Sequence, residues 1–259
     1  MNDDTGVDLI NSQGQFPLVL TCEHASCAVP EEYQNLGISS EELRRHIGWD
    51  IGARWVVQTL AQALDAPAIC SGYSRLLIDC NRDLNDHDLI VPESDGTRVF
   101  GNHAVSEKER QKRIAHFYQP YHAAIDDLLL KLGKRKPVVL SIHSFTPTLG
   151  EKKRPFDLGV LFDCHEDVAK EVGDRLHHCE YRVRYNEPYS GLDGLIFSAR
   201  SHGDRHGLVY LELEINNNLI DQAEKAAQIG RHLGEALKVL FSVESSESLT
   251  HPYENKTDG

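Results

Sequence analysis

The sequence predicts an α/β fold in which a mostly parallel, mixed sheet carries helices on both of its faces. The first observation is that short apolar runs of strand length alternate with longer stretches of helical period. The second is that neither an internal repeat nor a linker-like segment interrupts the 259 residues. A chain of this length buries a large core without disulfides or structural metals. We therefore expect a single three-layer α/β/α domain over residues 1–259, with its core at about 16–240 and a flexible tail at 242–259.

Seven segments have the apolar composition of buried strands. The clearest is Pro137–His143, which is almost entirely aliphatic until its last residue. The expected strands are residues 16–22, 68–70, 76–78, 137–143, 156–162, 181–185 and 208–214. Helical segments separate most of these runs, and that alternation is typical of parallel strands joined by crossover helices.

Four segments show helical period. The first begins near Ser40, where Ile47, Ile51 and Trp55 recur at nearly the spacing of one helical turn. The other expected helices are residues 107–132, with an interruption near Pro120, 165–177 and 221–241. Residues 81–101 and 186–191 are polar or rich in turn residues and are expected to be loops, as is the Gly-rich stretch that contains His202 and His206.

The composition excludes several classes of protein. The chain has 27 Lys and Arg against 40 Asp and Glu, and it has no basic stripe with interleaved aromatic residues, so we expect no nucleic-acid partner. Its apolar runs are too short to span a membrane, and its first residues are acidic and polar, unlike a secretory signal. The six cysteines are spread singly, as in reduced cytoplasmic proteins. We expect a cytoplasmic protein, and a monomer and a small homo-oligomer stay equally open.

Side chains that can bind ions or exchange protons lie at the ends of four of the predicted strands. Ligands of open α/β sheets bind beyond the carboxyl ends of the strands, so these residues are the candidates for a site. They are Glu23 and His24 after the first strand, Asp79, Asn81 and Arg82 with Arg75 around the third, His143 and Ser144 after the fourth, and Glu214 with Asn216–Asn218 at the last.

Two of the fourteen histidines are the best candidates for metal ligands. His24 and His143 both lie at strand ends, and a catalytic zinc needs three protein ligands and one open position. The third ligand is Glu23, Asp50 or Asp79. Adjacent side chains on extended backbone point to opposite sides, which disfavours Glu23 beside His24, whereas Asp50 can approach from a neighbouring loop.

The last strand supplies a candidate general base. Glu212 and Glu214 alternate with leucines and therefore point to one face of the strand. We interpret Glu212 as part of a solvated face and Glu214, nearer the carboxyl end, as the base. Arg75 and Arg82 suit carboxylate recognition, and structural ion pairing, for example with Asp79, is the alternative.

Six motifs together resemble the N-formylglutamate amidohydrolase family, in the family's order and over roughly residues 16–240. They are Thr21-Cys-Glu-His-Ala-Ser26, His46-Ile-Gly-Trp-Asp-Ile-Gly-Ala53, Ser74-Arg-Leu-Leu-Ile-Asp-Cys-Asn-Arg82, Ser141-Ile-His-Ser-Phe145, Asn186-Glu-Pro-Tyr-Ser-Gly191 and Glu212-Leu-Glu-Ile-Asn-Asn-Asn-Leu219. The resemblance implies a domain like those of the zinc carboxypeptidases and aspartoacylases. It also implies a Zn²⁺-dependent hydrolase of a linear amide in a small anionic N-acyl amino acid, with N-formyl-L-glutamate as the best guess.

The resemblance also implies roles for individual residues. His24, His143 and Asp50 are the implied zinc ligands, with Glu23 as the alternative acidic ligand. Asn81 and Arg82 would hold the substrate carboxylate, Arg75 would polarise the scissile carbonyl, and Glu214 would activate water. Tyr189 and Ser144 complete the expected substrate-binding set, with Tyr189 closing over the pocket from its loop.

One segment departs from the family pattern. Members often carry Arg-x-Asp after the glutamate of the last strand, whereas this chain has Asn216-Asn217-Asn218. The substrate is therefore less determined than the type of reaction. The alternatives are a metallo-carboxypeptidase-like hydrolase of small peptides and a non-catalytic protein that binds an anionic ligand.

Overall fold

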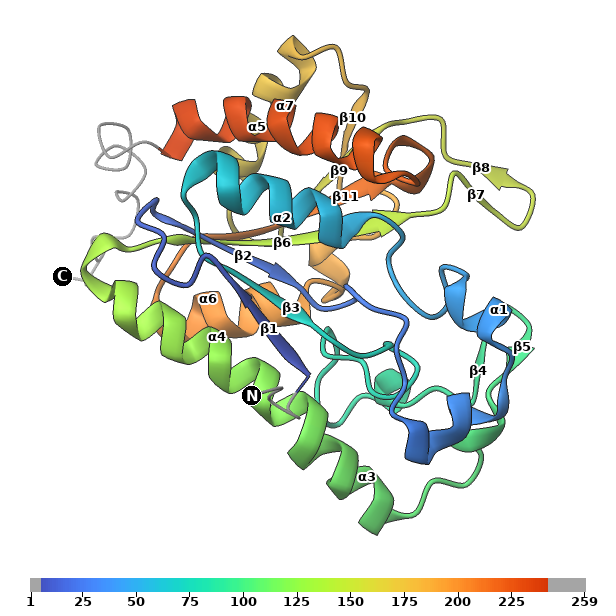
Figure 1. Cartoon of the computed structure of the whole chain (residues 1–259). Coiled ribbons are helices and arrows are strands. Elements are labelled where there is room, and N and C mark those ends of the chain that lie inside the picture. The colour runs from blue at the N-terminus through green and yellow to red at the C-terminus, as the bar shows by residue number, and fades with distance from the viewer. Residues whose placement is uncertain (1–5, 242–259) are drawn as a thin grey trace, which may run out of the picture.

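A seven-stranded sheet runs through the middle of the protein (Figure 1). The structure is a computed structural model that describes residues 6–241. The strand order is β1-β3-β2-β6-β11-β9-β10. The strands are β1 (Val7–Ile10), β2 (Leu18–Cys22), β3 (Ala68–Ser71), β6 (Val138–Phe145), β9 (Leu158–Leu161), β10 (Val183–Tyr185) and β11 (Tyr210–Asn216). Neighbouring strands are parallel except β1 with β3 and β11 with β9.

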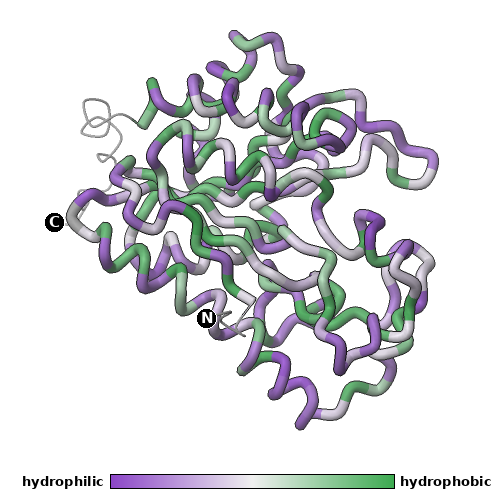
Figure 2. The backbone as a smooth tube through the Cα atoms, in the orientation of Figure 1, coloured by the Kyte–Doolittle hydropathy of each residue, from purple (hydrophilic) through white to green (hydrophobic). Residues whose placement is uncertain are grey.

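Helices cover both faces of this sheet. One layer consists of α2 (Ala53–Leu64), α5 (Glu166–His178) and α7 (Ala223–Phe241), and the other contains α4 (Gln119–Leu132) and α6 (Phe197–His206) (Figure 1). Two separate clusters of buried apolar side chains fill the spaces between the layers. Figure 2 shows the most hydrophobic stretches of the chain along the central strands. The predicted α/β fold with a mixed, mostly parallel sheet is confirmed.

Shorter elements extend the carboxyl-end side of the sheet. Two hairpins, β4 (Glu93–Ser94) with β5 (Thr97–Arg98) and β7 (Thr148–Leu149) with β8 (Lys152–Lys153), lie on the same side of the molecule in Figure 1. The remaining short helices are α1 (Ser40–Arg44), α3 (Glu107–Arg113), the π-helical turn Ile114–Tyr118, and 3₁₀ turns at Glu31–Gly37, His87–Leu89, Phe100–Asn102, Gly133–Arg135, Gly191–Asp193 and Asn217–Leu219.

The alternation of side chains along the central strands positions the site. In β11, Leu211 and Leu213 belong to the cluster under α2, α5 and α7, so Glu212 and Glu214 point to the layer of α4 and α6. The parallel register places Glu214 opposite His143 of β6. Both faces of these central strands are covered, and their polar side chains are therefore buried among other polar groups.

Most predicted strands and helices are present, with four differences. The strands expected at 16–22, 68–70, 137–143, 156–162, 181–185 and 208–214 correspond to β2, β3, β6, β9, β10 and β11, and the helices expected at 165–177 and 221–241 are α5 and α7. The strand predicted at residues 76–78 is wrong, because this segment is a turn whose leucines are buried in the second apolar cluster. Strand β1 was not predicted.

The helical predictions need two corrections. The stretch beginning near Ser40 is two helices, α1 and α2, separated by turns that include Gly48 and Gly52. The helix predicted at 107–132 is confirmed with its interruption near Pro120, where a π-helical turn joins α3 to α4. His202 and His206 belong to α6 and not to a loop. The expected tail at 242–259 lies outside the described residues.

Within residues 6–241, no helix combines the length and the apolar character needed to cross a membrane.

Candidate active site

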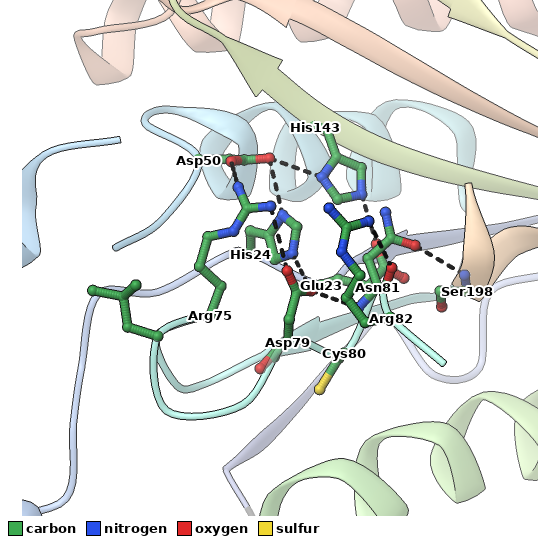
Figure 3. A network of polar contacts seen from close by, with 12 residues as sticks. Glu23, His24, Asp50, Arg75, Asp79, Cys80, Asn81, Arg82, His143 and Ser198 are labelled. Atoms are coloured by element: carbon green, nitrogen blue, oxygen red, sulfur yellow. Dashed lines mark hydrogen bonds and ion pairs between the residues drawn. The ribbon is translucent and has the colours of Figure 1, made fainter. Parts of the chain in front are cut away.

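A cluster of buried polar side chains lies at the carboxyl ends of β2, β6 and β11 (Figure 3). His24 follows β2, His143 lies in β6 and Glu214 lies in β11. These strands are neighbours in the sheet, so residues far apart in the sequence meet at one edge. Each of the three side chains is almost completely buried.

Asp50 reaches this cluster from the turn that precedes α2. Its backbone N–H donates a hydrogen bond of 2.9 Å to the carbonyl of His24, which ties the turn to the end of β2. Gly52 follows with a φ of 83°, and a Cβ there would lie 2.0 Å from the carbonyl oxygen of Ile220. Only glycine fits this close approach, and it lets the chain enter α2 with Asp50 turned inward.

His24 and His143 both present Nδ1 to the same carboxylate oxygen. Asp50 Oδ2 lies 2.8 Å from His143 Nδ1 and 3.4 Å from His24 Nδ1. Figure 3 shows the two rings and Arg75 converging on Asp50. One donor atom from each of His24, Asp50 and His143 falls within 4.8 Å of the others.

The opposite nitrogen of each ring is held by a second carboxylate. His24 Nε2 lies 2.7 Å from Asp79 Oδ1, and His143 Nε2 lies 2.9 Å from Glu23 Oε2. Glu23 also accepts hydrogen bonds from Tyr121 and Ser141. Glu23 and Asp79 thus lie on the far sides of the rings from Asp50, in the position of carboxylates that orient metal-binding imidazoles.

The three convergent residues fit a metal ion. His24 Nδ1 is buried and makes no hydrogen bond, with Asp50 Oδ2 as its neighbour at 3.4 Å, and a cation between these atoms would satisfy both. Two imidazoles and one carboxylate form the type of donor set found in catalytic zinc sites. A second group, made of His143, Glu212 and Glu214, also brings its donor atoms within 4.8 Å.

The carboxyl groups of the cluster differ strongly in acidity. Burial by itself would raise the pKa of Asp50, but the charge of His24 and the hydrogen bond from His143 hold this pKa well below its usual range. Burial raises the pKa of Glu212 to about 7, against the attraction of His143. Burial also raises the pKa of Glu214 well above its usual value, and the charges of Asp50 and Glu212 add to the rise.

The interpretation of Glu212 as a solvated residue is wrong. Its side chain is buried, its Oε2 accepts a hydrogen bond of 3.2 Å from Asn81, and it lies 3.5 Å from His143 Nε2. The error came from treating β11 as a strand with one face in water, whereas α6 covers that face. Glu214, two residues further along β11, has a buried Oε2 without a hydrogen-bond partner.

The two candidate arginines have different surroundings. Arg75 contacts Asp50 Oδ1 at 3.2 Å and Asp79 Oδ2 at 3.4 Å. Arg82 donates a hydrogen bond of 3.4 Å to the backbone carbonyl of Asn81 and makes no ion pair with any residue in the described range. Arg75 is therefore fixed by two carboxylates at close range, while Arg82 interacts with Asp79 only beyond ion-pair distance.

Two other predicted substrate-binding residues are held in place by hydrogen bonds. The Asn81 side chain donates to Glu212 and accepts the backbone N–H of Ser198 at 2.9 Å. The hydroxyl of Ser144 donates to the carbonyl of Ile51 at 3.0 Å, and its backbone N–H donates to Asp50. Both side chains nevertheless line the cavity described next.

An inner cavity of about 110 Å³ lies against these groups. Its lining residues are His24, His46, Asp50, Arg75, Asn81, Arg82, His143, Ser144, Tyr189, Leu195, Glu212 and Glu214. An outer cleft of about 870 Å³ shares His46, Arg75, Arg82 and Tyr189 with it. The predicted catalytic, metal-binding and substrate-binding residues therefore gather around one cavity, and Glu23 is the exception, since it does not line it.

Two residues of the site were not singled out from the sequence. His46 lines both cavities, its Nδ1 lies 3.7 Å from Asp50 Oδ1, and burial lowers its pKa to about 4. Arg154 is buried with its guanidinium 5.2 Å from the ring centre of Tyr189. His46 had a signal, because it precedes Asp50 by four residues in the same motif. Arg154 follows a run of charged residues, and nothing in the sequence distinguishes it from them.

The comparison with known proteins identifies the family of this chain. The family model described as N-formylglutamate amidohydrolase matches residues 16–220. The chain belongs to this family. An N-formylglutamate deformylase of Pseudomonas putida is 26% identical over 165 residues, which cover 58% of this chain and 61% of that protein. The chain thus matches about three fifths of the length of this curated relative.

Two crystal structures have similar folds. A gene product of Agrobacterium tumefaciens superposes with a TM-score of 0.85 at 32% identity, over 91% of this chain and 96% of that one. An N-formylglutamate amidohydrolase of Ralstonia eutropha superposes with a TM-score of 0.68 at 19% identity, over 93% and 99% of the two chains. The second likeness shows that the fold is shared.

Proposed function

We propose that the protein is a Zn²⁺-dependent amidohydrolase that cleaves the amide bond of small N-acyl amino acids. Family membership supports hydrolysis of a linear amide, and the name of the Pseudomonas putida relative makes N-formyl-L-glutamate the first substrate to test. The observation that carries the proposal is the convergence of His24 Nδ1, His143 Nδ1 and Asp50 Oδ2 on one side of a cavity that Glu214 also lines.

His24, His143 and Asp50 are the residues that would hold the ion. When bound, Zn²⁺ makes water a nucleophile at neutral pH, polarises a carbonyl group, and lowers the pKa of a neighbouring carboxyl such as Glu214. Glu23 and Asp79 hold the Nε2 sides of the two rings and leave both Nδ1 atoms directed at the cavity.

Glu214 is the proposed general base. Its unpartnered Oε2 is buried at the cavity, where it can take a proton from the attacking water and pass it to the leaving nitrogen. The acyl carbon gains the oxygen of water, the C–N bond breaks, and one proton of the water reaches the leaving nitrogen through Glu214. The second proton leaves the new carboxylic acid and protonates the freed amine, so the products are a carboxylate and an amino acid with a protonated amino group.

The arginines would bind the charges of the substrate and of the transition state. Asp50 and Asp79 hold Arg75 at the cavity wall, where its guanidinium can stabilise the developing oxyanion. Arg82, backed by Asn81, would bind the substrate carboxylate because no acidic side chain of the described residues lies within ion-pair distance of it. Tyr189 would close the cavity on the side where Arg154 packs against its ring.

The test is an assay of the purified protein after chelation and after reloading with Zn²⁺. We expect release of formate and glutamate from N-formyl-L-glutamate, or of another acid from a different N-acyl amino acid, only after reloading. His143→Ala should reduce turnover to background, whereas His178→Ala, at an exposed position at the end of α5, should leave it unchanged. Undiminished turnover of His143→Ala would show that this mechanism is wrong.

A further inference from the structure

The outer cleft is large for the substrate that the family name describes. Its volume of about 870 Å³ lies near the upper end of the roughly 300–1,000 Å³ that drug-sized ligands occupy. A formyl group adds only one carbon and one oxygen to an amino acid. N-formylglutamate bound at the inner cavity would therefore leave most of the outer cleft filled with water.

Part of the cleft wall is apolar and suits an uncharged chain. The apolar lining residues come from four separate segments and are Ile47, Ile51, Leu76, Val91 and Leu149. Threonine and serine side chains line it as well, at Ser94, Thr146 and Thr148. Leu149 lies in the β7–β8 hairpin with 52% of its surface exposed, so a ligand in the cleft can contact its side chain.

The charges at the cleft do not favour a second anionic group. Arg45 is paired with Glu42 at 2.5 Å and with Asp95 at 2.7 Å, and Arg75 is paired with Asp50 and Asp79. Asp88 and Glu93 add acidic groups to the lining. Among the arginines that line the cleft, only Arg82 makes no close ion pair with a carboxylate in the described part of the chain, and it also lines the inner cavity.

The inner cavity and the outer cleft meet at Arg75, Arg82 and Tyr189, which line both. With the carboxylate of the amino acid held by Arg82 on the side of the small inner cavity, the outer cleft is the space open to the acyl group. We propose that the outer cleft is an acyl-chain subsite, and that the preferred substrates are amino acids with an uncharged N-acyl group of about four or more carbons. This inference rests on the proposed amidohydrolase function and refines its substrate class.

The test compares N-acetyl-, N-butanoyl- and N-hexanoyl-L-glutamate, which share one type of amide bond, with N-formyl-L-glutamate alongside. Each methylene group that becomes buried should raise kcat/KM roughly fourfold. We expect at least a tenfold rise from the acetyl to the hexanoyl substrate. Leu149→Ala should lower kcat/KM for the hexanoyl substrate several-fold and leave the acetyl substrate within twofold. Leu130→Ala, at an exposed leucine of α4 away from the cleft, is the matched control.

A binding experiment separates this inference from the proposed function. Isothermal titration would use analogues in which a methylene group replaces the amide nitrogen, so that no hydrolysis is needed. Tighter binding of the hexanoyl analogue than of the acetyl one, lost in Leu149→Ala, supports the acyl subsite even if no N-acyl amino acid is hydrolysed. Hydrolysis of the acetyl, butanoyl and hexanoyl substrates with equal kcat/KM overturns the acyl subsite but supports the proposed amidohydrolase function. If the protein hydrolyses none of these substrates and binds the two analogues equally well, both the acyl subsite and the proposed function are overturned.

Discussion

At the scale of single residues, His24 and His143 are each held between two carboxylates. One ring nitrogen of each faces Asp50, and the other faces Asp79 or Glu23. An imidazole held at both edges has little freedom to rotate, so both Nδ1 atoms are preorganised before any ligand arrives. This arrangement explains why Glu23 is adjacent to His24 in the sequence and yet contacts the other histidine.

Glu214 and its neighbour Glu212 offer a direct comparison of two buried carboxyls on one strand. Glu214→Gln should lower kcat by roughly 10²–10⁴-fold, because the amide cannot accept the proton of the attacking water. Glu212→Gln should cost much less, since Glu212 already accepts a hydrogen bond from Asn81 and has a supporting position. Steady-state kinetics together with metal analysis checks this, and unchanged metal content keeps the comparison valid. A larger loss in Glu212→Gln would assign the base to that residue instead.

At the scale of elements, α2 and α7 pack side by side on one face of the sheet. Gly230 of α7 is the point of close approach, because a Cβ there would lie 2.7 Å from Thr59 Cβ of α2. Gly234, one turn later, faces a looser contact, with Ala63 Cβ at 3.4 Å from the position of the added carbon. The two glycines therefore lie in the same helix but differ in the space that a methyl group would have.

This difference gives a prediction about helix packing. Gly230→Ala should reduce the free energy of unfolding by about 1–3 kcal/mol, because the helices must move apart to accept the methyl group. Gly234→Ala should be neutral or stabilising by up to about 1 kcal/mol, through the higher helix propensity of alanine. Urea denaturation of both variants measures the two effects. Equal destabilisation by both substitutions would contradict this account of the interface.

Most elements were predictable from the sequence because their apolar periodicity reflects burial on a sheet or a helix. The segment 76–78 shows the limit of this signal. It is as apolar as a strand, but it lies in a loop whose side chains are buried in the second apolar cluster. Helix α6 was missed because Ser, Gly and His dominate it, and its burial against the sheet compensates for weak helical propensity. The site residues were accessible because strand ends carry them, whereas Glu212 required knowledge that α6 covers β11.

At the scale of the whole molecule, buried neutral histidines make stability depend on pH. His122 of α4 lies between Tyr118 and His202, and its Nδ1 is 2.8 Å from His202 Nε2. Burial, with the added charge of His202, lowers the pKa of His122 to about 3. In the unfolded chain the same group takes up a proton near pH 6.5. The unfolded state thus binds more protons between these two values, and stability falls as the pH falls below about 6.5.

We expect His122 to account for about 1–2 kcal/mol of the unfolding free energy lost between pH 7 and pH 5. In His122→Asn, whose side-chain amide can still bond to His202, the difference between the two pH values should shrink by that amount, whatever the absolute stability of the variant. Urea denaturation at both pH values provides the measurement. An unchanged difference would mean that His122 already titrates normally in the folded protein.

The residues of the proposed active site come from the end of β2, the turn before α2, β6 and β11, which are spread over most of the described chain. During synthesis, His24 and Asp50 emerge long before His143, and Glu214 emerges only with the last strand. A partly made chain therefore contains two of the proposed metal ligands but lacks the third and the proposed base. The contacts that join these strands are long-range, so the proposed site is assembled only when the sheet is complete.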